Sequence, residues 1–420
     1  MSTGARPIGT WAGLRYGALG LPLAFLALPL YVNLPDHYAR THDVPLATLG
    51  AVLLATRFVD AGLDPFIGPA VDRLFARSVR SAWFAAAAAA TVAAGAFAAL
   101  FLVPAGASLA MLAVGLVAAY VSYSVLSIVH QAWGTRLGGD ALQRARVTAW
   151  REGLGVIGVL LASVLPARAG LDATSALLAI AMLLGLWGLA RGPSADARGT
   201  AHGGSDWRLP LSDARFRGLL AVFMLNGIAA AVPATLLVFF VRDRLQLPGS
   251  LPLFLGAYFA AAVLAVWPWL RAVRRHGLAA CWLAAMLLAA ASFAGTLALG
   301  AGDGVGFLAV CVASGMALGA DLVLPGALLT GVVQRSGHAL RAEGAYAGWW
   351  TAATKLNLGL AAGVALPALA LAGYAPGTRD AQALQALAAA YVAVPCALKL
   401  AAAALLWRWR HHDLQQGVRA

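Results

Sequence analysis

Arg57-Phe-Val-Asp60-Ala-Gly-Leu-Asp64-Pro65 carries three charges inside an apolar run that extends from about residue 46 to residue 69. On a helix, residues three and four apart lie along one stripe, so Arg57, Asp60 and Asp64 face the same side. A charge at the centre of a membrane costs roughly 2.5–3.5 kcal/mol, and such residues usually mark ion or substrate pathways. The stretch therefore predicts a membrane-embedded helix that carries functional residues.

The charges of this stripe have two interpretations. Two carboxylates can bind a hard cation through their oxygens, or can share a proton, because two neighbouring carboxylates do not both ionise easily. Alternatively, Arg57 forms an internal salt bridge with one aspartate and ties helices together. Since two acids face one arginine, we predict a cation or proton site at Asp60 and Asp64, with Arg57 as a balancing charge.

The composition extends the membrane interpretation to the whole chain. Of 420 residues, 61% are hydrophobic and 11% charged, and the mean hydropathy is +0.79, which is too apolar for an ordinary soluble protein. A membrane helix needs about 20 apolar residues. The sequence predicts an all-α polytopic membrane protein with twelve spans, approximately at 14–34, 46–71, 82–103, 108–134, 148–167, 174–190, 216–241, 251–270, 278–299, 305–333, 343–372 and 383–407.

Arginine sets the expected orientation. Of the arginines, 22 lie on the side of the N-terminus and 5 on the other side of the predicted spans. The positive-inside rule then places both termini in the cytoplasm. The net charge of +13 is thus a topology signal and does not indicate nucleic-acid binding. We expect a multi-pass protein of the bacterial inner membrane, a monomer whose partners are the lipid bilayer and a small-molecule substrate.

A polar stretch divides the predicted spans into six and six. We expect an N-terminal six-helix bundle over 1–190, a cytoplasmic linker over 191–217 and a C-terminal six-helix bundle over 218–420. The three cysteines fall in predicted spans, so neither a disulfide framework nor a metal cluster is expected. No phosphate-binding Gly-x-x-x-x-Gly-Lys-Ser/Thr motif and no catalytic pair is found. We therefore expect a protein that is not an enzyme and has no cofactor.

Further polar residues mark candidate substrate positions. In the fourth span, Ser124, Ser127 and Gln131 recur at helical spacing and Trp133 follows them. The hydroxyls alternatively bond to their own helix, and Trp133 alternatively anchors the interface. Arg151 opens the fifth span beside an acid and is either a gate or substrate contact, or part of a solvated helix start.

The second half has its own candidates. Asn226 lies in the seventh span, and Asp321 stands beside a glycine and proline break in the tenth, where a broken helix can line a cavity. Lys355 is one of only two lysines in the chain, which suggests that a flexible or titratable ammonium is required. A structural role as partner of an aspartate is the alternative.

These motifs resemble known families. Gly68-x-x-x-Asp72-Arg73 after the second span is similar to the loop signature of the major facilitator superfamily, in which the aspartate caps and gates neighbouring helices. Arg57-x-x-Asp60-x-x-x-Asp64-Pro65, Gly319-Ala-Asp321-Leu-x-x-Pro325 and Glu343-Gly-x-Tyr346-x-Gly-x-Trp350-x-x-x-Thr354-Lys355 resemble the glycoside-pentoside-hexuronide:cation symporter family, which includes the melibiose permease-like proteins. The resemblance extends over nearly the whole chain and implies the major facilitator fold.

The resemblance also implies roles for residues. Asp60 and Asp64 would bind Na+, Li+ or H+, Ser124 would complete that site, Lys355 would serve coupling and Arg151 would lie near a sugar. Asp72 and Arg73 would act in gating. The remaining expected substrate contacts are Trp350, Thr354 and the positions of Ala24 and Ser127, where the family carries sugar-binding aspartates.

The departures from the family pattern refine the expected function. Leu63 replaces an asparagine between the two acids, which favours a proton over Na+. Ala24 and Ser127 lack the carboxylates that grip sugar hydroxyls. We expect a secondary transporter coupled to H+ or Na+ that moves a small organic solute, such as a sugar or glycoside, by alternating access between the two bundles. The alternatives are an amphiphilic or lipid-like substrate, or an uncoupled facilitator.

Overall fold

The structure, a computed structural model, describes residues 8–41, 46–102, 108–195, 206–374 and 377–417. These residues contain helices and no strand. They form two compact units: Met1–Ser212 with Thr330–Ala352, and Asp213–Leu329 with Ala353–Ala420. The segment Thr330–Ala352 lies in the second half of the sequence but groups with the first unit.

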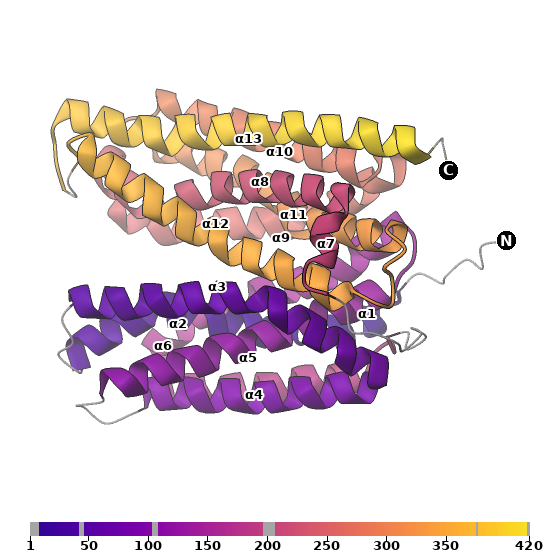
Figure 1. Cartoon of the computed structure of the whole chain (residues 1–420). Helices are drawn as coiled ribbons and strands as arrows, with labels where there is room; N and C mark the ends of the chain where they lie inside the picture. Colours follow the sequence, from indigo (N-terminus) through magenta and orange to yellow (C-terminus); the bar gives the residue numbers. More distant parts are fainter. Residues whose placement is uncertain (1–7, 42–45, 103–107, 196–205, 375–376, 418–420) are drawn as a thin grey trace. The chain divides into compact units, whose positions relative to one another are not determined.

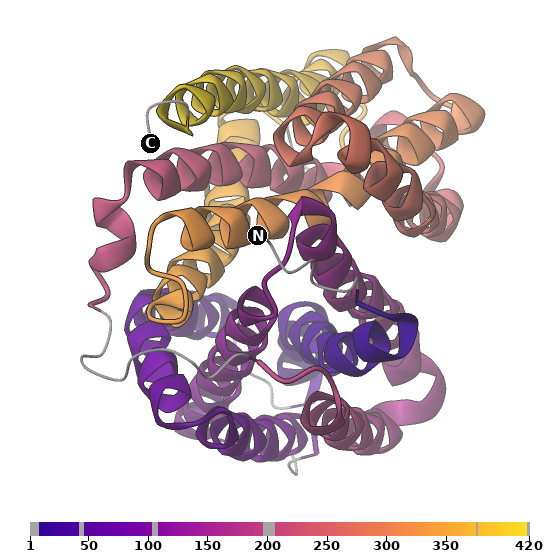
Figure 2. The same cartoon turned by 90° about the vertical axis from the view of Figure 1, so that its right-hand side faces the viewer.

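The first unit is a helical bundle (Figure 1). Within it, α2 packs along α6, and α5 packs along both α3 and α4. Figure 2 shows several of these helices nearly end-on. The helices of the first unit are α1 (Thr10–Gly17), α2 (Gly20–Thr41), α3 (Leu46–Arg77), α4 (Val79–Phe101), α5 (Leu109–Arg136), α6 (Ala141–Arg191) and α7 (Leu209–Ser212).

The second unit is also helical, and α13 packs against both α8 and α10. Most of α11 and α12 belongs here, whereas the last residues of α11 and the first residues of α12 belong to the first unit. Its elements are α8 (Ala214–Phe239), the π-helical turn η1 (Phe240–Arg244), the 3-10 turns η2 (Pro248–Ser250) and η3 (Thr296–Ala298), α9 (Leu251–His276), α10 (Leu278–Gly295), α11 (Gly304–Arg335), α12 (Glu343–Leu371) and α13 (Ala381–Gly417).

Side-chain caps and one glycine explain where several helices begin. Ser78, Ser108, Asp140 and Asp213 precede α4, α5, α6 and α8, and each accepts a hydrogen bond from a backbone N–H of the first turn, which satisfies a donor that the helix leaves unpaired. Gly170, with φ 82°, interrupts α6 because left-handed backbone is easily adopted only by glycine. The break separates two membrane-length segments, Ala141–Pro166 and Arg168–Arg191.

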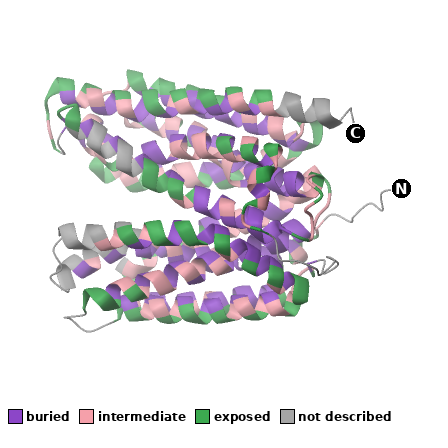
Figure 3. Cartoon of the chain, viewed as in Figure 1, coloured by how far each residue is buried: buried purple, intermediate pink, exposed green. Residues whose placement is uncertain are grey.

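Ten segments of the described residues are long and apolar enough to cross a membrane. Along these helices buried and exposed residues alternate, as Figure 3 shows. The buried side includes aromatic residues in each unit, such as Phe25 and Phe97 in the first and Phe254 and Phe307 in the second. The all-α polytopic architecture is confirmed. The count of twelve spans and the cytoplasmic termini remain predictions.

Candidate functional site

The two acids of the opening stretch are buried on α3. The exposed fraction is 3% for Asp60 and 0% for Asp64. Ser124 Oγ on α5 lies 3.0 Å from Asp60 Oδ1 and 3.0 Å from the carbonyl oxygen of Tyr120. A hydroxyl has one proton and two lone pairs. Ser124 therefore either donates to Asp60, or donates to Tyr120 and accepts from a protonated Asp60.

Arg57 is half-buried on the same helix. Its guanidinium carbon lies 5.1 Å from the ring centroid of Tyr120 on α5, within the range of a cation–π interaction. Tyr120 thus contributes a ring to Arg57 and a carbonyl oxygen to Ser124. The arginine, the serine and Asp60 are joined around one tyrosine between α3 and α5.

Glycines let the first turns of α12 approach this part of α3 closely. A Cβ added at Gly348 would lie 2.4 Å from the carbonyl oxygen of Asp64, and one added at Gly68 would lie 2.2 Å from the carbonyl oxygen of Gly344. Any larger residue would push the two backbones apart. The small residues of the predicted motifs, Gly68, Gly344 and Gly348, therefore have a packing reason.

Asp72 caps the N-terminus of α12. Its carboxylate accepts hydrogen bonds from the backbone N–H groups of Gly344, at 2.7 Å, and Ala345, at 2.9 Å. The first turn of a helix offers unpaired N–H groups and a positive dipole end, so it attracts a carboxylate. Arg73, its neighbour in the motif, is exposed.

Arg136 at the end of α5 connects the cap to a second acid. Its Nη2 lies 2.9 Å from Glu343 Oε2 and 3.8 Å from Asp72 Oδ1, and its guanidinium carbon lies 4.4 Å from the ring centroid of Phe75. The three charged side chains are all buried. No role was predicted from the sequence for Arg136, which ends an apolar run, or for Glu343, which opens one of the predicted motifs.

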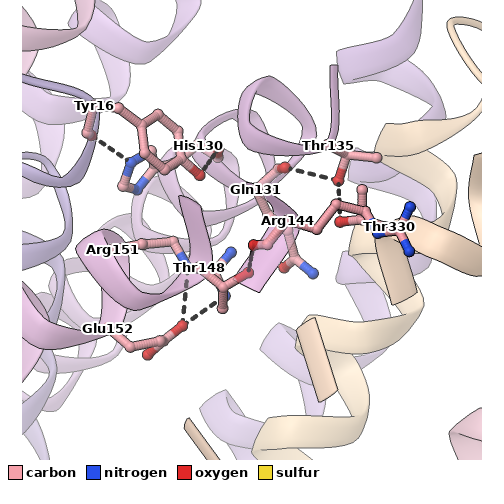
Figure 4. A network of polar contacts seen from close by, with 9 residues as sticks. All are labelled: Tyr16, His130, Gln131, Thr135, Arg144, Thr148, Arg151, Glu152 and Thr330. Carbon is pink, nitrogen blue, oxygen red and sulfur yellow. Dashed lines mark hydrogen bonds and ion pairs between the residues drawn. The ribbon is translucent and has the colours of Figure 1, made fainter. Parts of the chain in front are cut away.

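A polar network surrounds the predicted substrate residues of α5 and α6 (Figure 4). Tyr16 and His130 are bonded twice: Tyr16 Oη donates to the carbonyl oxygen of His130 at 3.0 Å, and His130 Nε2 lies 2.8 Å from the carbonyl oxygen of Tyr16. Arg151 donates twice to Glu152 Oε1, at 2.9 and 2.5 Å. Gln131 is buried and its carbonyl oxygen accepts from Thr135.

The other predicted residues of the first unit have different surroundings. Trp133 donates to the carbonyl oxygen of Pro193 at 3.0 Å, which ties α5 to the segment after α6, and packs edge-on against Phe75 of α3. Ala24 and Ser127 are half-buried, and Trp350 is buried. These three lie on α2, α5 and α12 respectively.

The second unit brings Asn226 and Asp321 together with a lysine. Asn226 Nδ2 donates to Asp321 Oδ1 at 3.0 Å, and Lys399 Nζ donates to Asp321 Oδ2 at 2.6 Å and to Asn226 Oδ1 at 2.8 Å. Trp282 Nε1 also donates to Asp321 Oδ1, at 2.8 Å. The sequence analysis missed Lys399 and Trp282. The rarity of lysine in this chain was the signal that could have found Lys399.

Thr354 and Lys355 lie on α12 in the second unit. Thr354 is exposed and Lys355 is half-buried. Within the described residues, no group of three or more His, Cys, Asp or Glu side chains could hold a metal ion. Among the predicted site residues, Asp60 contacts Ser124, and Asn226 contacts Asp321. Asp72 caps α12, and the lysine that joins Asn226 and Asp321 is Lys399 instead of the predicted Lys355.

Comparisons with known proteins agree on the fold. The structure is similar to a bacterial homologue of the iron transporter ferroportin in an outward-facing state, with TM-score 0.69, 16% identity and coverage of 96% of this chain and 99% of that one. It is also similar to the transporter FucP in the outward conformation, with TM-score 0.65, 16% identity and coverage of 93% and 98%. A third similar structure is the human organic anion transporter MFSD10, with TM-score 0.61, 16% identity and coverage of 94% and 98%.

The sequence itself matches a family. A comparison with curated proteins gave no match. A family model described as MFS/sugar transport protein matches residues 13–412, which is nearly the whole chain. The chain therefore belongs to the MFS/sugar transport protein family and is a polytopic membrane transporter of the major facilitator superfamily.

Proposed function

We propose that the protein is a cation-coupled secondary transporter of a small organic solute, and that Asp60 and Asp64 bind the coupling ion. The observation that carries this proposal is the buried carboxylate of Asp60 beside the hydroxyl of Ser124, at 3.0 Å. A buried carboxylate in an apolar span is costly when charged, so binding of a cation relieves that cost. Binding of the ion at Asp60 and Asp64 can thereby be coupled to the conformational change of the transporter.

A proton is the favoured coupling ion. When Ser124 donates its proton to the carbonyl oxygen of Tyr120, its oxygen keeps a lone pair that can accept from a protonated Asp60. Both protonation states of Asp60 thus have a matching hydroxyl orientation. Leu63 stands between the acids, where the resembled symporters carry an amide that helps to bind Na+.

We further propose that the cap of α12 acts as a gate. Asp72, Arg136 and Glu343 form buried contacts that hold the first turn of α12 in the first unit. From Ala353 onward α12 belongs to the second unit. Since α12 passes from one unit to the other, breaking and remaking these contacts would accompany alternating access. The arginine distribution supports placement of this gate at the cytoplasmic side of a bacterial inner membrane.

The test is counterflow and gradient-driven uptake in proteoliposomes made with wild type, Asp60→Asn and Asp172→Asn. Asp172 is an exposed acid of α6 and controls for the substitution itself. We expect Asp60→Asn to lose accumulation driven by a proton gradient or a Na+ gradient, and Asp172→Asn to retain it. Full coupling in Asp60→Asn would refute the role of this acid.

A further inference from the structure

The second unit contains an ion pair between the buried Lys399 and the half-buried Asp321. Lys399 is only 2% exposed. An ammonium has three N–H donors, and Lys399 directs two hydrogen bonds, one to Asp321 and one to Asn226. One N–H can therefore serve another acceptor. Asp321 accepts from Lys399, Asn226 and Trp282, so its carboxylate is held in place from three helices.

A cavity of about 140 Å³ lies beside this pair. A cavity of about 150 Å³ lined by apolar side chains stays dry and accommodates benzene, so this one has room for a single aromatic ring. Its lining is mostly apolar and aromatic, with both members of the ion pair among the lining residues. The aromatic lining residues are Phe254, Tyr258, Phe259, Phe293, Phe307 and Tyr391.

The aromatic walls support one another. The ring centroids of Phe254 and Phe307 lie 4.9 Å apart with an edge-on geometry, and those of Phe293 and Tyr391 lie 6.1 Å apart, also edge-on. Such pairs stabilise each other beyond the burial of their surface. The walls are thus preorganised, and a ring bound between them would lose little further freedom in the protein.

The ion pair is hard to explain by helix packing alone. Burying an ion pair in apolar surroundings costs more than packing apolar side chains of the same volume, unless every polar group is satisfied. A pair that only joined α11 to α13 would be expected in close-packed surroundings. Here Asp321 and Lys399 border empty space between aromatic walls, which is the arrangement of a ligand site with few, precisely placed polar groups.

We propose that this cavity binds a small aromatic monocarboxylate together with one proton. The ring occupies the aromatic cavity and the carboxylate accepts from Lys399 in place of Asp321. The proton, taken from water, forms an O–H bond on Asp321. The net charge of the site is then zero before binding, with Lys399 positive and Asp321 negative, and zero after it, with Lys399 positive and the ligand negative.

The other groups that line the cavity leave Asp321 as the proton acceptor. Tyr258 on α9, Cys311 on α11 and Tyr391 on α13 are titratable, but their ordinary pKa values of about 8.5–10 keep them neutral at pH 6–7. Trp282 on α10 and Asn226 on α8, which face Asp321 from the remaining elements of the cluster, do not titrate. Within this cluster only Lys399 carries an opposing charge.

The inference names a substrate class and rests on the proposed transport function only for its meaning in transport. Binding itself is measured on the purified full-length protein by titration calorimetry with sodium benzoate at pH 6, 6.5 and 7. Buffers of different ionisation enthalpy give the number of protons taken up. We expect about one proton per benzoate, and an affinity that falls about tenfold per pH unit because binding and protonation are linked.

Benzyl alcohol and four variants test the carboxylate, the ion pair and the cavity separately. Benzyl alcohol has the same ring without the carboxylate and should bind at least tenfold more weakly. Asp321→Asn should bind benzoate without proton uptake. The double variant Asp321→Asn with Lys399→Met, which leaves no unpaired charge, should lose benzoate binding. Ala289→Leu should narrow the cavity and weaken the binding of both benzoate and benzyl alcohol, since Ala289 lines the cavity. The matched control is Ser292→Ala on α10. The hydroxyl of Ser292 donates to its own helix, so this variant should bind benzoate as the wild type does.

The outcomes are decisive. Absence of saturable benzoate binding, equal binding of benzyl alcohol, or benzoate binding without proton uptake in wild type would each overturn the inference. Gradient-driven uptake in Asp60→Asn is measured separately in proteoliposomes. Loss of coupling there without benzoate binding would refute this inference alone, whereas proton-linked benzoate binding with full coupling in Asp60→Asn would refute only the proposed role of Asp60.

Discussion

The two units surround an acid in an apolar span with different partners. In the first, Asp60 has a hydroxyl partner that can donate to it or accept from it. In the second, Asp321 is held by a lysine, an amide and an indole, all of which donate to it. The hydroxyl of Ser124 can pair with either protonation state of Asp60, whereas the three donors at Asp321 match a carboxylate.

The comparison teaches that an acid in an apolar span does not by itself define a role. Partner chemistry distinguishes the two sites, because a hydroxyl is both donor and acceptor and an ammonium only donates. This difference underlies our two proposals, ion coupling at Asp60 and substrate recognition at Asp321. Each proposal can be tested by replacing the partner, Ser124 or Lys399, while leaving the acid in place.

The largest effect on stability is expected when the lysine is removed from the second site. Lys399→Met would leave the half-buried Asp321 without its counter-charge. Breaking a fully buried pair typically costs about 3–5 kcal/mol, and the partial exposure of Asp321 places the expected loss at the lower end of that range. Adding Asp321→Asn should restore much of that loss, because no unpaired charge remains. Thermal unfolding of the four proteins of this double-mutant cycle measures the coupling.

An unchanged melting temperature in Lys399→Met would mean that Asp321 does not depend on the lysine. In that case the contrast between the two sites would fail. Equal losses in the single and double variants would place the cost in lost packing of the lysine stem rather than in the charge.

The cap of α12 provides a test of intermediate size. Asp72→Asn removes the charge from two hydrogen bonds to backbone N–H groups, and bonds to charged groups contribute about 1.5–3 kcal/mol. We expect a loss of stability within that range and slower transport. Arg73→Gln is the neighbouring comparison, and its exposed side chain predicts a change within about 0.5 kcal/mol. Reversal of this order would contradict the cap.

The serine of the first site should have a smaller effect on stability and a clear effect on coupling. Ser124→Ala removes a buried hydrogen bond, worth about 0.5–1.5 kcal/mol. Because the hydroxyl serves both protonation states of Asp60, we expect the pH dependence of uptake to shift while folded protein remains in the membrane. Ser292→Ala, whose hydroxyl donates to its own helix α10, controls for loss of a hydroxyl. Identical pH profiles in all three proteins would remove Ser124 from the site.

A third acid, outside the two sites, gives the smallest effect and a pH test. Asp243 Oδ2 accepts from Tyr374 Oη at 2.5 Å and from the backbone N–H of Gly377 at 3.0 Å. Burial and this hydrogen bond raise the pKa of Tyr374 above its usual value. The protonated phenol is therefore favoured in the folded state, and its stabilising contribution should be lost as the pH rises above about 10.

Tyr374→Phe should abolish that alkaline loss and leave the stability near neutral pH lowered by about 1 kcal/mol. Thermal unfolding from pH 8 to 11 measures both effects. A loss of the same size in the variant would show that another group titrates there.

Much of the fold could be predicted because a membrane helix is recognised from consecutive residues of the sequence. Runs of about 20 apolar residues indicated the helices, and the charges of α3 stood out against such a run. The break of α6 at Gly170 was foreseen as a boundary between two spans. By contrast, the separation of α1 from α2 within the predicted span 14–34 was not predicted, although Gly17, Gly20 and Pro22 mark it.

The sites were predicted only where their chemistry is local. Asp60 and Asp64 are four residues apart and visible in one helical turn. Lys399 and its partner Asp321 are 78 residues apart in sequence, and no local pattern connects them. Glu343 was noticed only as part of a motif, because its contact with Arg136 depends on how α12 packs in the first unit.

We propose that the acids of α3 bind the coupling ion. The most direct measurement is thermal unfolding of purified wild type, Asp60→Asn and Asp64→Asn over a grid of pH and Na+ concentration, since a ligand that binds only the folded protein raises its stability by mass action. We predict a dependence on pH, or on Na+, in wild type that is lost in both variants. The same dependence in all three proteins would contradict the claim.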